Sequence, residues 1–203
     1  MARAKDADYE PAIRLANVAG GLEVEKIGVA TVTRDEILRD LLHSGPGNDK
    51  VLTREALVRE LESRRRLGQH VAFTNGCFDV LHAGHVQYLQ EARAQADVLV
   101  VGLNTDGSIR ALKGPGRPIN PAAARSLVLA ALQAVDYVTV FDEATPLELI
   151  TAVRPDVLVK GADYRKDEVV GADFVENRGG RVHLAALREG YSTTNLLRRL
   201  EAA

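Results

Sequence analysis

The chain has 203 residues, a formal net charge of −2 and 46% hydrophobic residues, which is enough for one domain with a full core plus an extension. Its basic residues are spread out, so no electrostatic footprint for nucleic acid appears, and a single cysteine excludes an intramolecular disulfide framework and a cysteine-rich zinc site. No apolar run reaches the length of a membrane span and no signal-peptide pattern is present, so we expect a cytoplasmic protein.

The first segment comprises residues 1–49, and a cluster of Gly, Pro and Asn at 44–49 separates it from the rest of the chain. It contains a helix-like stretch at 12–19 and a strand-like stretch at 29–33. A short piece of this kind lacks a core of its own, so we expect it to be partly disordered. The expected organisation is therefore an N-terminal extension (1–49) followed by one domain (50–203).

Helical and strand-like patterns alternate after this cluster. Thr53 is a plausible N-cap for a helix that runs to about Arg66, with Gly68 as its stop signal. The last turn of this helix carries Arg64, Arg65 and Arg66, which we interpret as a solvated face or as partners of the helix dipole. Strands are predicted at 70–75, 97–103, 136–141, 156–160 and 181–187, and helices at 84–95, 105–112, 121–134, 145–153, 166–177 and 193–201.

The predicted strands are continuous apolar runs, such as Val98 to Val101, which are typical of strands covered on both faces. Alternation with helices predicts an α/β fold with a Rossmann-like, doubly wound, parallel five-stranded sheet. Ligands of such sheets bind beside the carboxyl ends of the strands.

The run from Asn75 to His85 (NGCFDVLHAGH) links the first predicted strand of this sheet to a helix. The N-terminus of a helix offers unpaired N–H groups and a partial positive charge, which suit a phosphate. Glycine at 84 lets the phosphate approach the backbone, and His82 and His85 add donors. Taken alone, the two histidines could instead cap or pack against the helix start.

The run resembles the signature of the HxGH nucleotidyltransferase superfamily. Four later runs, in the expected order, are similar to the adenylyltransferase domain of the heptose-phosphate enzymes that make ADP-heptose: residues 102–106, 112–120, 159–164 and 190–194. The resemblance covers about residues 50–203. It implies the HxGH nucleotidyltransferase fold and transfer of AMP from ATP to D-glycero-D-manno-heptose 1-phosphate.

Residues 12–33 resemble the last helix and strand of a ribokinase-like sugar kinase. The glycine-rich anion hole and catalytic aspartate of such kinases are missing from this stretch, so we do not expect the chain to phosphorylate sugars. An ordinary helical extension is the alternative interpretation.

The motif runs supply the expected site residues. We expect His82, His85 and Lys113 to be catalytic, with His85 on the transferred α-phosphate. Nucleotide-binding roles are expected for Gly76, Cys77, Phe78, Gly84, Asn104, Asp106, Lys160, Gly161, Ser192, Thr193 and Thr194. Substrate-binding roles are expected for Asp79, Lys113, Arg125 and Asp163.

Some of these residues also have simpler explanations. Lys113 could be a solvated lysine, Asp79 could organise its own loop, and Arg125 could be an ordinary surface arginine. Cys77 is more simply a small filler of the turn than a nucleophile. Asp163 and the run from Ser192 to Thr194 could be plain helix caps.

No acidic cluster is dense enough for an all-protein metal cage, so we expect Mg²⁺ to be carried by the nucleotide. The expected partners are ATP, a sugar 1-phosphate and a second copy of the chain in a homo-oligomer such as a dimer, without nucleic acid or membrane. Two other functions stay open: cytidylyl transfer to a polyol or amino-alcohol phosphate, and a non-catalytic nucleotide-binding module. The preference for ATP over CTP comes from the resemblance alone.

Overall fold

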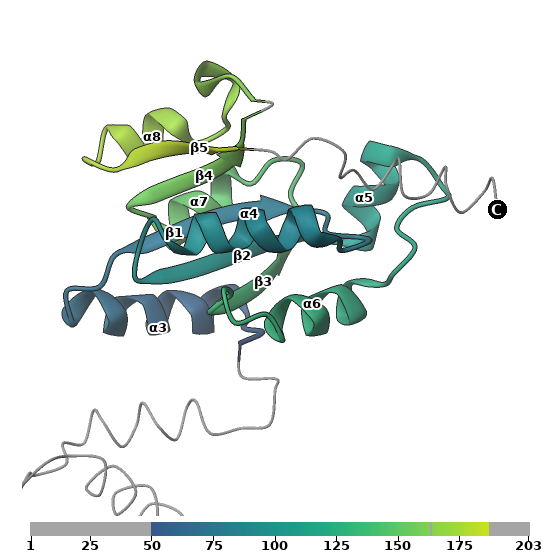
Figure 1. Ribbon diagram of the computed structural model, residues 1–203, viewed down its shortest axis with the longest axis horizontal. Coiled ribbons are helices and arrows are strands. Elements are labelled where there is room, and N and C mark those ends of the chain that lie inside the picture. The colour runs from purple at the N-terminus through teal and green to yellow at the C-terminus, as the bar shows by residue number, and fades with distance from the viewer. Residues whose placement is uncertain (1–49, 163, 187–203) are drawn as a thin grey trace, which may run out of the picture. The chain divides into compact units, whose positions relative to one another are not determined.

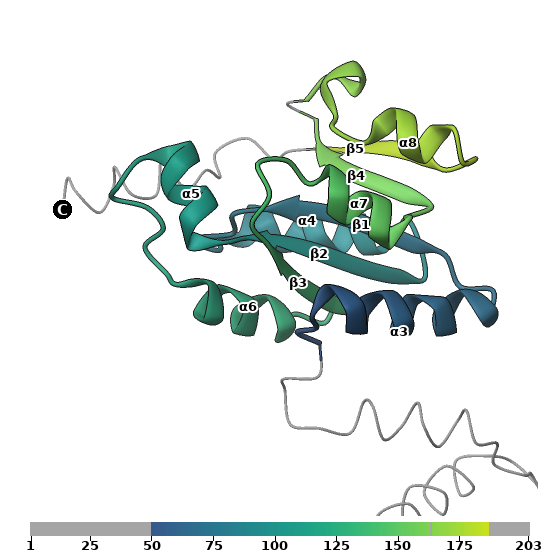
Figure 2. The same ribbon diagram turned by 180° about the vertical axis from the view of Figure 1, so that it is seen from behind.

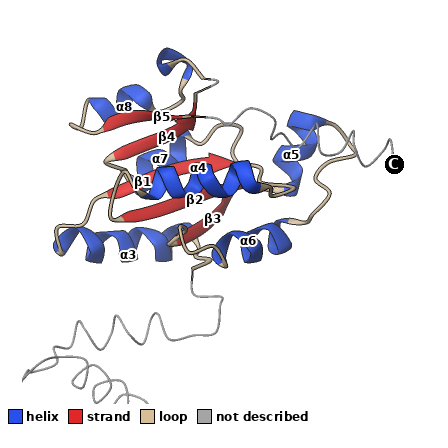
Figure 3. Ribbon diagram, viewed as in Figure 1, coloured by secondary structure: helices blue, strands red, loops and turns tan. Residues whose placement is uncertain are grey.

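A computed structural model describes residues 50–162 and 164–186, and these residues form one layered α/β unit (Figures 1 and 3). Its strands are β1 (Val71–Gly76), β2 (Val98–Asn104), β3 (Tyr137–Phe141), β4 (Val157–Gly161) and β5 (Arg181–Ala185). Its helices are α3 (Arg54–Arg66), α4 (Ala83–Arg93), α5 (Asp106–Lys113), α6 (Ala122–Ala130), α7 (Leu147–Val153), the 3₁₀ turn η1 (Lys166–Glu168) and α8 (Ala172–Glu176).

The five strands form one parallel sheet in the order β3-β2-β1-β4-β5. The chain adds β2 and β3 on one side of β1, then returns to place β4 and β5 on the other side. The strand order therefore reverses between β1 and β4, where open sheets of this type bind ligands beyond the carboxyl ends of the strands. This topology confirms the predicted Rossmann-like, doubly wound fold.

Two hydrophobic clusters cover the two faces of the sheet. Alternate strand residues point to opposite faces, so Val71 and Phe73 of β1 pack in one cluster while Ala72 packs in the other. Helices α3, α7 and α8 contribute to the first cluster, and α4 and α6 contribute to the second. Figures 1 and 2 show α4 on one side of the sheet and α7 on the other. The apolar runs of the central strands thus fill two cores at once.

The predicted strands and the first helix agree with the structure to within one or two residues. Thr53 is the N-cap of α3, where its hydroxyl accepts a hydrogen bond from Ala56 N at 3.3 Å. Gly68 follows the helix with φ of +76°, a conformation that favours glycine. The predicted helix 193–201 lies outside the described residues.

The prediction of one continuous helix over 166–177 is wrong. The 3₁₀ turn η1 and the short helix α8 occupy this range, and the chain between them is not helical. Gly171 has φ of +89° and packs so close to α7 that an added Cβ would lie 2.8 Å from Ile150 Cδ1. Val169, which is buried in the core, also departs from the helical path. Packing against α7 therefore overrides the local helical preference.

Two other predicted helices are longer than the observed ones. The helix predicted at 145–153 begins at Leu147, with Pro146 as its N-cap residue. The helix predicted at 121–134 ends at Ala130, after which turns lead to Val135.

Two of the three arginines in the last turn of α3 make contacts with other elements of the protein. Arg64 pairs with Glu60 at 2.9 Å and donates to the Tyr137 hydroxyl at 2.6 Å, so it ties α3 to β3. Arg65 donates to the carbonyl oxygens of Val153 and Arg154 at the end of α7. The interpretation as a solvated face is thus wrong for these two side chains.

Residues 50–52 form a short added rung beside β3. Lys50 Nζ donates to Leu132 O and Val135 O, at 3.2 and 2.7 Å. On the outer edge of β3, Val138 N donates to Lys50 O at 2.7 Å and Leu52 N donates to Val138 O at 2.9 Å. These residues therefore belong to the sheet domain.

We expect deletion of residues 1–48 to leave the unfolding free energy of the domain unchanged, whereas deletion of residues 1–52 should lower it by about 2–4 kcal/mol. The second truncation removes several hydrogen bonds, each with a net contribution of about 1 kcal/mol, together with the packing of Val51 and Leu52. Urea unfolding of the two truncated proteins measures the difference. Equal midpoints would show that the rung contributes nothing to stability. The predicted boundary at residue 49 stays a prediction.

Among the described residues, none of the helices combines the length and apolarity that crossing a bilayer requires.

Candidate active site

The motif runs that the structure describes meet at the carboxyl edge of the sheet, beside the strand-order reversal. Asn75 lies at the end of β1 and Lys160 near the end of β4. Lys160 Nζ donates to Asn75 Oδ1 at 2.6 Å, and its ammonium lies 5.6 Å from the centre of the Tyr164 ring. A hydrogen bond therefore joins the two sides of the switch point directly above the sheet.

A tight turn follows β1 and sets the position of Phe78. This residue has φ of +44°, an uncommon conformation for a non-glycine residue. A Cβ on Gly76 would lie 3.1 Å from the Phe78 ring, so glycine leaves the space that the ring occupies. The buried ring meets His85 edge-on, with centroids 5.5 Å apart. Gly76 and Phe78 thus act in the fold by orienting His85.

His82 and His85 lie together at the start of α4. Their rings stack with centroids 3.9 Å apart and an interplanar angle of 25°. His82 is the N-cap residue and makes no side-chain capping bond, and Ala83 and Gly84 occupy the first helical positions. The N–H groups of Ala83 and Gly84 have no acceptor within the described ranges. The helix start therefore presents backbone donors beside two imidazoles, as an anion site requires.

Burial lowers the pKa of His85 to about 4, with further contributions from His82 and from the positive charge of Lys113. Burial also lowers the pKa of His82. Both rings are thus neutral at pH 7 and act as hydrogen-bonding groups without a charge of their own. Nδ1 of His85 is buried without a hydrogen-bond partner among the described residues. Nε2 is consequently the nitrogen that can meet a ligand.

The lowered pKa of His85 predicts a loss of stability in weak acid. The histidine of the unfolded chain binds a proton near pH 6.5, whereas the folded one binds it only near pH 4. The free energy of unfolding is therefore unaffected by this group above pH 6.5 and decreases as the pH falls from 6.5 toward 4. His85→Gln has no such group. We therefore expect the difference in unfolding free energy between the wild type and His85→Gln to shift in favour of the variant between pH 6.5 and 4, as measured by urea unfolding. A difference that is constant with pH would contradict the buried neutral histidine.

Lys113 is the last residue of α5, and the chain turns sharply after it. Gly114 has φ of +94°, which favours glycine. Lys113 is exposed, and its charge acts on His85. The lysine therefore lies close enough to His85 for its charge to help lower that pKa, and its expected catalytic role stays a prediction.

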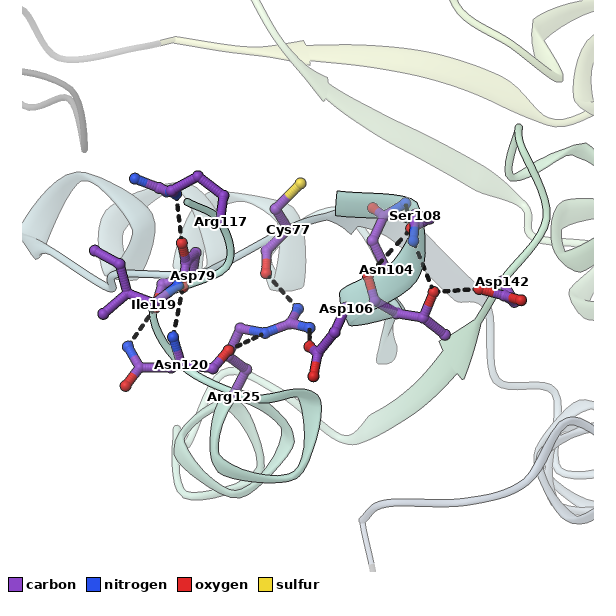
Figure 4. Close-up of polar contacts among 11 residues, drawn as sticks. Cys77, Asp79, Asn104, Asp106, Ser108, Arg117, Ile119, Asn120, Arg125 and Asp142 are labelled. Atoms are coloured by element: carbon purple, nitrogen blue, oxygen red, sulfur yellow. Dashed lines mark hydrogen bonds and ion pairs between the residues drawn. The ribbon is translucent and has the colours of Figure 1, made fainter. Parts of the chain in front are cut away.

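Asp79 holds the loop that follows Lys113. Its Oδ1 accepts hydrogen bonds from Ile119 N at 2.8 Å and Asn120 N at 2.9 Å, while Asn120 Nδ2 donates to Asp79 O at 2.7 Å (Figure 4). The Asp79 side chain is 1% exposed. It organises the loop, which is one of the two roles expected from the sequence. Its expected contact with substrate stays a prediction.

Arg125 is a large, fully buried side chain in α6. Its guanidinium donates to Asn120 O at 2.9 Å, to Cys77 O at 2.7 Å and to Asp106 Oδ1 at 2.6 Å (Figure 4). These acceptors lie on three segments: the turn after β1, the first residue of α5 and the loop before α6. The structure thus engages every nitrogen of Arg125 within the protein, while its expected contact with a sugar phosphate stays a prediction.

The other predicted residues fall into two groups. Asn104 Nδ2 donates to Ser108 Oγ at 3.1 Å at the start of α5, Cys77 lies half-buried in the turn, and Gly161 ends β4. All three border the same edge of the sheet. Four predicted residues lie outside the described residues: Asp163, Ser192, Thr193 and Thr194.

Within the part of the chain that the structure describes, no group of three or more His, Cys, Asp or Glu side chains is arranged to hold a metal ion. The carboxylates of Asp79 and Asp106 are already engaged by backbone N–H groups and arginines.

A family model described as cytidylyltransferase-like matches residues 73–199. The match includes the histidine pair, Lys113 and the end of β4. The chain belongs to the cytidylyltransferase-like family.

Curated relatives of this chain are identical to it at about half of the aligned positions. "Bifunctional protein HldE" of Syntrophotalea carbinolica is 53% identical over 190 residues, which is 93% of this chain and 39% of the relative. The protein of the same name in Caulobacter vibrioides is 51% identical over 204 residues, which is 100% of this chain and 42% of the relative. The chain therefore spans about two fifths of the length of these relatives.

Solved structures show the same fold. The lipopolysaccharide core biosynthesis protein of Thermoplasma volcanium is 28% identical with a TM-score of 0.51, and the match covers 62% of this chain and 100% of that one. The pantoate-beta-alanine ligase of Francisella tularensis has a TM-score of 0.52 at 14% identity over 72% of both chains. At that identity the second likeness concerns the fold alone.

Sequence reasoning gave no role to Asn75, Arg117 or Asn120, which the structure places in the network around the site. All three stand inside the motif runs, so their positions carried a signal. Their interaction partners could not be predicted from the sequence, because each contact joins residues about 40 or more positions apart.

Proposed function

We propose that this chain transfers AMP from ATP to D-glycero-D-manno-heptose 1-phosphate, giving ADP-heptose and pyrophosphate. The observation that carries the proposal is the identity of 51–53% to proteins named bifunctional HldE over 93–100% of the chain. It agrees with the resemblance of the motif runs to heptose 1-phosphate adenylyltransferases. The stacked histidines beside open helix N–H groups support a triphosphate at this edge of the sheet.

In the proposed reaction, an oxygen of the sugar phosphate attacks the α-phosphorus of ATP. A new P–O bond forms there as the bond to the bridging oxygen of the β-phosphate breaks, and pyrophosphate leaves with that electron pair. The attacking phosphate is already ionised at neutral pH, so no side-chain base is needed. Catalysis then depends on alignment of the two phosphates and on stabilisation of charge at the α-phosphorus.

The described residues can supply these functions. His85 Nε2 and the N–H groups at the start of α4 donate to phosphoryl oxygens, and Lys113 supplies a mobile positive charge. Mg²⁺ would be held largely by the triphosphate and water, because the nearby carboxylates of Asp79 and Asp106 have other partners. When bound, the ion neutralises phosphate charge.

The experiment is a pyrophosphate-release assay with ATP, CTP and GTP in separate reactions, each with a panel of sugar phosphates. We expect release with ATP and the heptose 1-phosphate. Binding of nucleotide without any release, across the full panel, would favour the non-catalytic module.

A second candidate is cytidylyl transfer to a polyol or amino-alcohol phosphate, which the description of the matching family favours. Competition between ATP and CTP distinguishes the two. A CDP-linked product formed in preference to an ADP-linked one would overturn the choice of base and leave the mechanism intact.

A further inference from the structure

A buried carboxylate holds one side of the Arg117 guanidinium. Arg117 Nε and Asp79 Oδ2 lie 2.7 Å apart as an ion pair, although the alignment is not that of a hydrogen bond. The Asp79 side chain is 1% exposed and that of Arg117 is 17% exposed. Since the other carboxylate oxygen accepts two backbone N–H groups of the same loop, the aspartate itself is fixed.

Within residues 50–162 and 164–186, the ion pair with Asp79 engages only the inner nitrogen of the Arg117 guanidinium. Neither Nη group has a hydrogen-bond or ion-pair partner in the described ranges of the chain. Figure 4 shows the end of the Arg117 side chain directed away from Arg125. Arg125 differs in this respect, because Nε and both Nη atoms already donate to the protein.

We infer that Arg117 binds the phosphate of the sugar 1-phosphate, and that Asp79 is the positioning residue that orients its guanidinium. This inference rests on the proposed function, and it adds Arg117 to Lys113 as a second cation that binds the sugar phosphate. An arginine fork with a fixed inner nitrogen presents two parallel N–H groups, which match two oxygens of a phosphate.

The other donors of the site indicate that Arg117 meets the phosphate of the sugar and not the triphosphate. The triphosphate has the start of α4 and two histidines, whereas the acceptor phosphate needs cations of its own. Lys113 and Arg117 stand at the two ends of a loop of three residues, Gly114-Pro115-Gly116. Two cations on one short loop can neutralise a dianion before it approaches the α-phosphorus.

The first test compares Arg117→Gln with Arg110→Gln. Arg110 is an exposed arginine of α5, so it controls for the loss of one positive charge nearby. We expect Arg117→Gln to raise the KM for heptose 1-phosphate by about 10- to 100-fold, as for one charge-assisted contact, with the KM for ATP within about twofold. Arg110→Gln should leave both KM values within about twofold.

The second test concerns the positioning role. Asp79→Asn keeps an oxygen that can accept from Ile119 N and Asn120 N but loses the charge that holds Arg117. We expect a raised KM for the sugar phosphate, and a double variant with Arg117→Gln no worse than Arg117→Gln alone. Thermal unfolding of each variant separates this effect from a loss of folding. Fully additive effects of the two substitutions would contradict the positioning role.

The outcomes separate the inference from the proposed function. An Arg117→Gln variant that is folded and has a wild-type KM for the sugar phosphate overturns the inference alone. A larger rise in the KM for ATP than for the sugar phosphate also overturns it, because Arg117 would then serve the nucleotide. A wild-type protein that neither binds heptose 1-phosphate in titration calorimetry nor converts it contradicts the proposed function, and the inference with it.

Discussion

His85→Ala is expected to lower kcat by about 10²–10³, the usual effect of removing one donor to charge that develops in a transition state. The ring packs against His82 and Phe78 with Nδ1 buried, and in the proposed reaction Nε2 is the nitrogen that donates to a phosphoryl oxygen. The loss should appear in kcat more than in the KM for ATP, because the N–H groups at the start of α4 remain. Single-turnover measurement of pyrophosphate release tests this directly.

His70→Ala provides the matched control. His70 has a side chain 69% exposed and lies just before β1, at the opposite end of that strand from the histidine pair. We expect it to leave kcat unchanged. A folded His85→Ala protein with wild-type turnover would show that the histidine pair has a purely structural role.

Arg125→Met is expected to lower the unfolding free energy by about 3 kcal/mol, because it leaves Asp106 without its buried cation and two carbonyl oxygens without a donor. Activity should fall as well, since the turn after β1, the start of α5 and the loop before α6 lose their common partner. Urea unfolding and kcat measured on the same preparation test both effects.

Arg125→Lys distinguishes this role from direct binding of substrate. A lysine ammonium keeps the charge beside Asp106 but cannot span three acceptors, so we expect part of the stability to return. If Arg125 bound the sugar phosphate instead, Arg125→Met would raise the KM for that substrate and leave the unfolding free energy unchanged. This second pattern is the one that we expect for Arg117→Gln.

The sequence predicted the elements well and their partners poorly. The central strands could be located because both of their faces are buried, which leaves a continuous apolar run such as Val98–Val101. The break in the helix predicted at 166–177 could not be seen, because it depends on the contact of Gly171 with Ile150 in another helix. Local pattern contains no information on such packing.

The same limit applies to the site. The motif predicted that His82, His85 and Lys113 share one environment, since residues at strand ends and helix starts of a parallel sheet converge. The motif could not show which arginine is engaged within the protein and which can meet a ligand. Arg125 looks like a surface residue in the sequence and is buried, whereas Arg117 stands in a Gly/Pro loop and has an available guanidinium. Each arginine pairs with one aspartate, and only the three-dimensional positions of the Asn120 and Cys77 carbonyl oxygens show that Arg125 has its remaining nitrogens engaged as well.

The strand order has a consequence for a chain that is still being synthesised. β1 is made first but lies in the middle of the sheet, and its neighbour β4 follows it by about 80 residues. Until β4 leaves the ribosome, β1, β2 and β3 can pair while one edge of β1 keeps its hydrogen-bonding groups open to other chains. Lys160 arrives with β4, so the contact with Asn75 that closes the switch point forms in the same late step that covers this edge.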